Sequence, residues 1–140
     1  MAKDSKEKYV QWVPSRSKNA KDGGKTEKGH KDEEWVFMKN IKPMKVAPGF
    51  ERKVLAYCDE AMVIASEFDK GATVADHVHA HTQITYIQEG RFSYSVEGVA
   101  KEVAKGDSVC VPSGATHTTI CLEKGSLVEF FTPMRKDFLR

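Results

Sequence analysis

A chain of 140 residues is long enough for one ordinary domain with a core and too short for two comfortable ones. Its 22 lysine and arginine residues nearly balance 20 aspartate and glutamate residues, so the charge gives little reason to expect a nucleic-acid surface. The sequence has no run of about 18 apolar residues that would span a bilayer, and its lysine-rich amino terminus lacks an apolar segment with a cleavage site. We therefore expect a single-domain cytoplasmic protein with neither nucleic-acid nor membrane partners.

Residues 1–34 differ in composition from the rest of the chain. They are crowded with charge, contain Gly23 and Gly24 in succession, and after Met1 hold large apolar side chains only between residues 9 and 13. A segment of this kind buries too little apolar surface to fold by itself. We predict a charged, largely irregular amino-terminal arm with His30 exposed, and with residues 9–13 either solvated or docked on the domain or on a partner subunit.

From residue 35 to residue 140 the chain turns to short runs rich in valine, isoleucine, threonine and aromatic residues, separated by glycine, proline and acidic turns. This pattern is typical of an all-β sandwich or barrel. The expected strands are residues 52–57, 61–68, 73–79, 83–88, 91–96, 100–104, 107–112, 118–123 and 127–133.

Two groups of side chains within these strands are expected in the interior. Three cysteines are widely spaced in apolar runs, which favours buried free thiols over a disulfide framework. Three aromatic residues occupy strand positions where a core or a cavity wall is expected. The cysteines are Cys58, Cys110 and Cys121, and the aromatic residues are Tyr86, Phe92 and Tyr94.

The stretch HVHAHTQ, residues 77–83, places three histidines at alternate positions. Alternate residues of a strand share one face, and three ligands in a single line cannot enclose an ion. Two histidines can help to enclose an ion if the chain turns after His79 and returns as a new strand that starts at Gln83. The alternative is that these histidines lie on the solvated face of one strand.

A fourth donor is expected from His117, which follows a strand that ends at Pro112 and a bend that Gly114 permits. Four of the five histidines in the chain thus fall in two short segments, each next to a turn. Such clustering favours a metal site built from both segments.

These residues resemble the two motifs of the cupin family. The first motif, a glycine, an HxH pair, a carboxylate or amide four residues later and a closing glycine, is matched by Gly71, His77, His79, Gln83 and Gly90.

The second cupin motif, glycine-x5-P-x-G-x2-H, is matched by Gly106, Pro112, Gly114 and His117. The sequence departs from the usual pattern twice, with an amide at the position of the usual glutamate in the first motif and with Cys121 at the usual asparagine. The resemblance covers about the last hundred residues.

The resemblance implies a double-stranded β-helix, or jelly-roll barrel, over residues 35–140, with the arm at residues 1–34 outside it. It also implies a homodimer, with an edge strand beginning near Trp35 and Phe37 that crosses to the second subunit. One divalent transition metal is expected inside the barrel, and zinc, nickel, iron, manganese, cobalt and copper all suit imidazole ligands. The expected ligands are His77, His79, Gln83 and His117, and His81 is expected at the cavity mouth as a hydrogen-bonding neighbour.

The carboxyl-terminal sequence VEFFTPMRKDFL resembles the end of the pectin-degradation cupins, which linearise unsaturated monouronates by ring opening to a keto acid. Their acidic residue, phenylalanine and arginine correspond to Glu129, Phe131 and Arg135, with glutamate where aspartate is usual. The resemblance implies that Glu129 acts as general acid or base, that Phe131 packs against the sugar ring and that Arg135 binds a substrate carboxylate. For Glu129, a solvated strand face is the alternative.

Three functions remain open from the sequence. The first is a non-redox lyase or isomerase acting on a small, anionic sugar acid or keto acid, because neutral Gln83 leaves the ion its full double charge. The second is an oxygenase that uses iron held by the three histidines. The third is a barrel that binds a small ligand without turnover.

Overall fold

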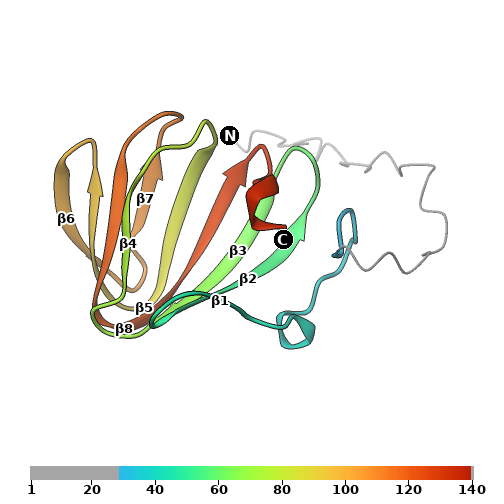
Figure 1. Cartoon of the computed structure of the whole chain (residues 1–140), viewed down its shortest axis with the longest axis horizontal. Helices are drawn as coiled ribbons and strands as arrows, with labels where there is room; N and C mark the ends of the chain where they lie inside the picture. Colours follow the sequence, from blue (N-terminus) through green and yellow to red (C-terminus); the bar gives the residue numbers. More distant parts are fainter. Residues whose placement is uncertain (1–28, 140) are drawn as a thin grey trace, which may run out of the picture.

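The computed structural model describes residues 29–139, so the predicted docking of residues 9–13 lies outside the described part. Within it the chain is all-β, with eight strands and two short 3₁₀ helices (Figure 1), which confirms the predicted fold class. None of its helices is long and apolar enough to cross a membrane. The elements in chain order are η1 Met38–Asn40, β1 Met44–Ala47, β2 Phe50–Tyr57, β3 Met62–Phe68, β4 Thr73–His77, β5 Thr82–Val96, β6 Val99–Ala104, β7 Ser108–Val111, β8 His117–Thr132 and η2 Lys136–Phe138.

Two long strands, β5 and β8, organise the barrel because each of them belongs to two sheets. The second half of β8 pairs with β3 and with the first half of β5, and β2, β1 and β7 extend this sheet. The first half of β8 pairs with β4 and with the second half of β5, which pairs with β6. In Figure 1 the two sheets diverge from the bends of β5 and β8, with β6 at one end of the molecule.

The bends of β5 and β8 lie where the sequence predicted turns. Residues 89–90 and 123–125 were expected to separate four strands, but the chain continues through both positions as two strands. Gly90 has a φ of 81°, and a Cβ atom there would lie 2.5 Å from the carbonyl oxygen of Lys124. Glycine at this position therefore allows the two backbones to cross in close contact while each strand changes sheet.

The segment before β1 does not form the expected edge strand. Trp35 and Phe37 are 72% and 59% exposed, are followed by η1 and lie in no strand of the described chain, so the predicted crossing to a second subunit stays a prediction. The edge of the first sheet is instead β1, which the sequence did not predict, and all of its residues are exposed.

The described end of the arm lies against the barrel. His30 was expected to be exposed, but its Nε2 atom donates a hydrogen bond of 2.8 Å to the carbonyl oxygen of Leu55, and its ring packs edge-on against Tyr57. The main-chain nitrogen of Asp32 also donates to the carbonyl oxygen of Tyr57. These contacts fix residues 30–32, and the boundary at residue 34 stays a prediction.

Alternation along the strands places one face of each sheet in the interior. Phe92 and Tyr94 are buried as expected, but Tyr86 is 45% exposed because it points to the outer face of β5. Of the three cysteines, which are all free thiols, only Cys121 is buried as predicted. The prediction was wrong for Cys110, which is exposed because it lies on the outer face of β7.

Candidate metal centre and cavity

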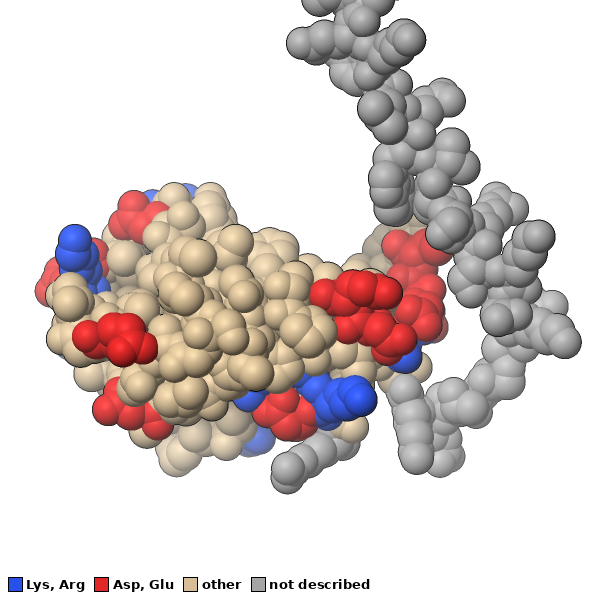
Figure 2. All heavy atoms as spheres, turned by 90° about the horizontal axis from the view of Figure 1, so that it is seen from above, with Lys and Arg blue, Asp and Glu red and all other residues tan. Residues whose placement is uncertain are grey.

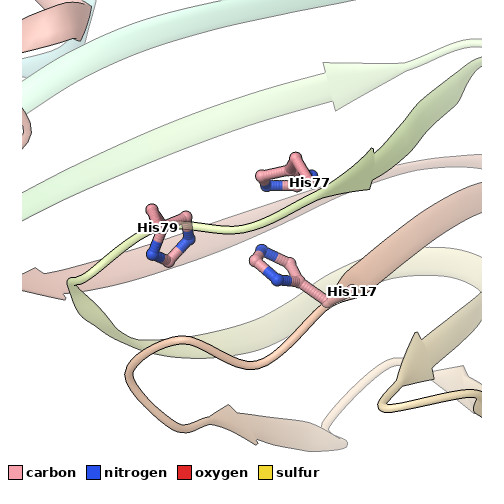
Figure 3. A group of neighbouring side chains, drawn as sticks. All are labelled: His77, His79 and His117. Atoms are coloured by element: carbon pink, nitrogen blue, oxygen red, sulfur yellow. The ribbon is translucent and has the colours of Figure 1, made fainter.

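Three of the five histidines converge at one end of the barrel. His77 ends β4, His79 follows in the connecting loop and His117 begins β8. Because His77 lies opposite His117 in the pairing of β4 with β8, their rings approach to 3.9 Å between centroids. One nitrogen from each of the three rings can be chosen so that all lie within 4.8 Å of one another, and Figure 3 shows the rings gathered in this way.

Main-chain hydrogen bonds orient all three imidazoles. The Nδ1 atoms of His77, His79 and His117 each lie 2.9–3.0 Å from the carbonyl oxygen of a residue two positions away in the chain. A carbonyl oxygen only accepts, so each Nδ1 carries the proton and each Nε2 has a lone pair available for a cation. His81 supplies one of these carbonyls, and its own ring lies outside the cluster.

Gln83 begins the strand that returns from the histidine loop, and its side chain is 2% exposed. Its Nε2 atom lies 2.5 Å from Glu129, 2.9 Å from Tyr94 and 3.0 Å from Thr85, so its two N–H groups are shared among three acceptors. These acceptors fix the orientation of the amide and turn its Oε1 atom toward His79. The sequence did not reveal that Thr85 and Tyr94 hold this amide in place.

The contact between Gln83 and His79 provides a test for the fit of a metal ion. The Oε1 atom of Gln83 lies 2.9 Å from the Nε2 atom of His79, and with the His79 proton on Nδ1 both of these atoms are acceptors. Two facing lone pairs repel unless a cation lies beside both. The Nε2 atom of His117 is also buried without a hydrogen-bond partner. The residues present therefore fit a divalent metal ion.

Burial favours the neutral form of His77 and His117. It lowers the pKa of His77, and it lowers the pKa of His117 to about 4. Neutral imidazoles are the form that binds a transition metal.

Glu129 lines the cavity inside the barrel. The alternative position, on a solvated strand face, is therefore excluded. Glu129 is opposite Thr85 in the pairing of β5 with β8 and lines the same cavity as Gln83 and two of the histidines. Burial raises the pKa of Glu129 to about 7, although Arg52 and Arg135 both act to lower it. A carboxyl group with this pKa exists in both protonation states near neutral pH.

Phe131 and Arg135 also line the cavity. Phe131 is 1% exposed, and its ring packs edge-on against His79. Arg135 was expected to bind a substrate carboxylate, but its guanidinium already donates two hydrogen bonds to Asp137, of 3.1 and 2.6 Å. Two of its N–H groups are therefore already committed within the chain.

Arg52 is a cavity residue that the sequence analysis missed. It lies on β2 between the inward-facing Phe50 and Val54, and its guanidinium carbon is 3.6 Å from the centre of the Phe138 ring. The signal was available, because an arginine at an inward position of an alternating strand is unusual. Phe138 was not identified from the sequence because it lies in η2, beyond the last strand.

The cavity that these residues enclose has a volume of about 120 Å³. A larger groove of about 910 Å³ lies beneath the turn at Pro48 and Gly49, but no histidine or arginine lines it. The smaller cavity is therefore the candidate functional site. Seen from above in Figure 2, the middle of the described surface shows no Lys, Arg, Asp or Glu, and charged side chains lie toward its margins.

Fold and site together define a cupin. The model of the cupin domain family matches residues 65–132, and the chain belongs to this family.

Its relatives include a protein named for pectin degradation. The chain is 36% identical over 93 residues to the pectin degradation protein KdgF of Dickeya dadantii (strain 3937), a match that covers 65% of this chain and 84% of that protein. The solved structure of KdgF from Halomonas sp. is 31% identical with a TM-score of 0.73, covering 76% of this chain and 99% of that one. An RmlC-like cupin from Shewanella frigidimarina NCIMB 400 is 36% identical with a TM-score of 0.74, covering 76% and 96%.

Proposed function

We propose that this cupin is a metal-dependent isomerase that opens the ring of an unsaturated monouronate released from pectin. One observation carries the proposal. The amide of Gln83 joins the histidine cluster to the carboxylate of Glu129 in the cavity wall, through contacts of 2.9 Å to His79 and 2.5 Å to Glu129. A cation site and a proton-transfer group thus share one small cavity, in a chain related to a protein named for pectin degradation and similar to a solved structure of KdgF.

His77, His79, Gln83 and His117 would hold the ion. A divalent transition metal at this position would supply Lewis acidity, which favours negative charge on the oxygens of a bound sugar acid. All four ligands are neutral, so the chain itself does not reduce the charge of the ion. This favours non-redox chemistry over an oxygenase, in which a carboxylate ligand would help to stabilise a higher oxidation state.

Glu129 would move the proton. In the ring opening, the anomeric hydroxyl loses its proton as the bond between carbon 1 and the ring oxygen breaks, and the resulting enolate becomes a ketone when carbon 4 gains a proton. The reaction is an isomerisation, so no oxidant, reductant or water is consumed. Glu129 can accept the first proton and deliver the second because its pKa is about 7.

Phe131 and Arg135 would shape the wall beside the reacting ring. Phe131 offers an apolar surface next to His79. The guanidinium carbon of Arg135 lies 5.3 Å from the centre of the Phe131 ring. The positive charge of Arg135 favours the ionised form of Glu129 and would favour an anionic substrate.

The substitution Glu129→Gln tests this function. The variant keeps a similar shape but carries no ionisable proton, so we expect kcat to fall about a hundredfold or more. Turnover is followed by the loss of the ultraviolet absorbance of the conjugated double bond, with the keto acid identified by nuclear magnetic resonance. The matched control is Glu67→Gln, on the outer face of β3, which should keep the activity of the unsubstituted protein.

Other outcomes would favour the alternatives. Full activity in Glu129→Gln would remove Glu129 from the mechanism. Oxygen uptake by the iron-loaded protein, without ring opening, would favour the oxygenase. Binding of the uronate with no conversion by the metal-loaded protein would favour a barrel that only binds its ligand.

A further inference from the structure

Arg52 has no function in the mechanism above, yet it occupies the cavity wall. It comes from β2, and Glu129 comes from β8, with β3 between these two strands in the sheet. The Phe138 ring lies 3.6 Å from the Arg52 guanidinium carbon and 4.1 Å from that of Arg135. Stacking on an aromatic ring fixes the plane of a guanidinium and leaves its N–H edge free to meet a ligand.

Arg52 lacks a partner of opposite charge. Among residues 29–139, no carboxylate oxygen lies within 4.0 Å of its guanidinium nitrogens, and its Nε atom is buried without a hydrogen-bond partner. Its cross-strand neighbour Ser66 is also buried, and the hydroxyl of that residue makes no hydrogen bond either. A buried N–H donor without a partner is costly, and a ligand with acceptor oxygens would relieve that cost for the Nε of Arg52.

The two cavity arginines differ in this respect. Arg135 gives two of its N–H groups to Asp137, whereas Arg52 keeps its donors uncommitted. Burial and the nearby charge of Arg135 lower the pKa of Arg52, and Glu129 acts in the opposite direction.

We propose that Arg52 binds the carboxylate of the substrate and that this contact makes the cavity selective for sugar acids over neutral sugars. The planar fork of an arginine matches the two oxygens of a carboxylate, and such paired hydrogen bonds are among the strongest in proteins. The proposal rests on the proposed function for the identity of the sugar, but it concerns binding and requires no turnover.

The test compares two ligands that the proposed reaction cannot consume. Galacturonate and galactose share a ring, but only galacturonate carries a carboxylate, and neither has the double bond of the unsaturated uronate. Their dissociation constants are measured by isothermal titration calorimetry with metal-loaded protein, and the metal content of each variant is measured in parallel.

The variants are Arg52→Gln, Arg52→Lys, Arg135→Gln and the control Lys53→Gln. Lys53 neighbours Arg52 on β2 but points to the other face of the strand, so its substitution removes the same charge outside the cavity. We expect the unsubstituted protein to prefer galacturonate clearly over galactose. Arg52→Gln should weaken galacturonate binding about tenfold to a hundredfold while leaving galactose binding unchanged.

Arg52→Lys should recover only part of the affinity, because lysine keeps the charge but lacks the planar fork. Arg135→Gln should change galacturonate binding less than Arg52→Gln does, and Lys53→Gln should match the unsubstituted protein. If Arg52→Gln does not fold, the comparison of Arg52→Lys with the unsubstituted protein decides, and equal affinity would overturn the proposal.

Three further results would overturn the assignment. In the first, Arg52→Gln binds galacturonate within twofold of the unsubstituted protein at equal metal content. In the second, the unsubstituted protein binds both sugars with equal affinity. In the third, Arg135→Gln loses more galacturonate affinity than Arg52→Gln does. The proposed function fails separately. If galacturonate binds through Arg52 but the unsaturated uronate is not converted, the binding assignment stands and the isomerase does not.

Discussion

At the scale of single residues, Gln83 links the histidine cluster, which would bind the metal ion, to Glu129, which would transfer the proton. Its Oε1 atom faces His79, while its Nε2 atom donates to Glu129, Tyr94 and Thr85. A glutamate at this position would place a second carboxylate beside Glu129, and two adjacent carboxylates raise the pKa of one of them. The amide avoids this conflict and keeps the proposed ligand set neutral.

Tyr94→Phe tests whether the neighbours of Gln83 support metal binding. The substitution removes one of the hydroxyl acceptors that hold the amide, so we expect metal affinity to fall about tenfold. Affinity is measured by competition with a chromophoric chelator. The control is Tyr86→Phe, on the outer face of the same strand, and equal losses in the two variants would argue against a specific role of Tyr94.

At the scale of elements, the barrel depends on β5 and β8 crossing from one sheet to the other. This crossing brings the start of β8, with His117, and its end, with Glu129 and Phe131, into one cavity. Gln83 and Tyr94 come from the two halves of β5 in the same way. The site therefore requires that both strands bend at the same place.

Gly90→Ala tests this requirement. The added Cβ would meet the backbone of Lys124 in a left-handed conformation, so we expect a loss of about 3 kcal/mol or more in the free energy of unfolding. The control is Gly98→Ala, where φ is also positive but no atom lies within 4 Å of the added Cβ, and about 1 to 2 kcal/mol is expected. Urea unfolding measures both losses, and equal losses would show that the close approach at Gly90 does not matter.

At the scale of the whole molecule, the fold and the histidine cluster were predictable because alternation and turn residues reveal strands locally. The residues at 77, 79 and 117 fall next to turns, and two segments with this spacing suffice to predict a shared site. The bends at Gly90 and Gly125 were predicted as turns, since a glycine that allows a close backbone approach looks in sequence like a glycine in a turn.

Contacts between distant segments were less predictable. The stacking of Arg52 on Phe138 and the pairing of Arg135 with Asp137 depend on how the carboxyl-terminal segment folds back over the cavity, and local sequence patterns carry no information about this. The homodimer also stays a prediction.

The most direct test of the site is the metal content of untagged protein, measured by plasma mass spectrometry after loading with zinc, nickel, manganese or iron and removal of free ion. The arrangement of His77, His79, Gln83 and His117 predicts about one ion per chain, and the double variant His79→Ala, His117→Ala should retain almost none. Retention of no metal under any loading condition, or equal retention by the double variant, would contradict a metal centre at these residues.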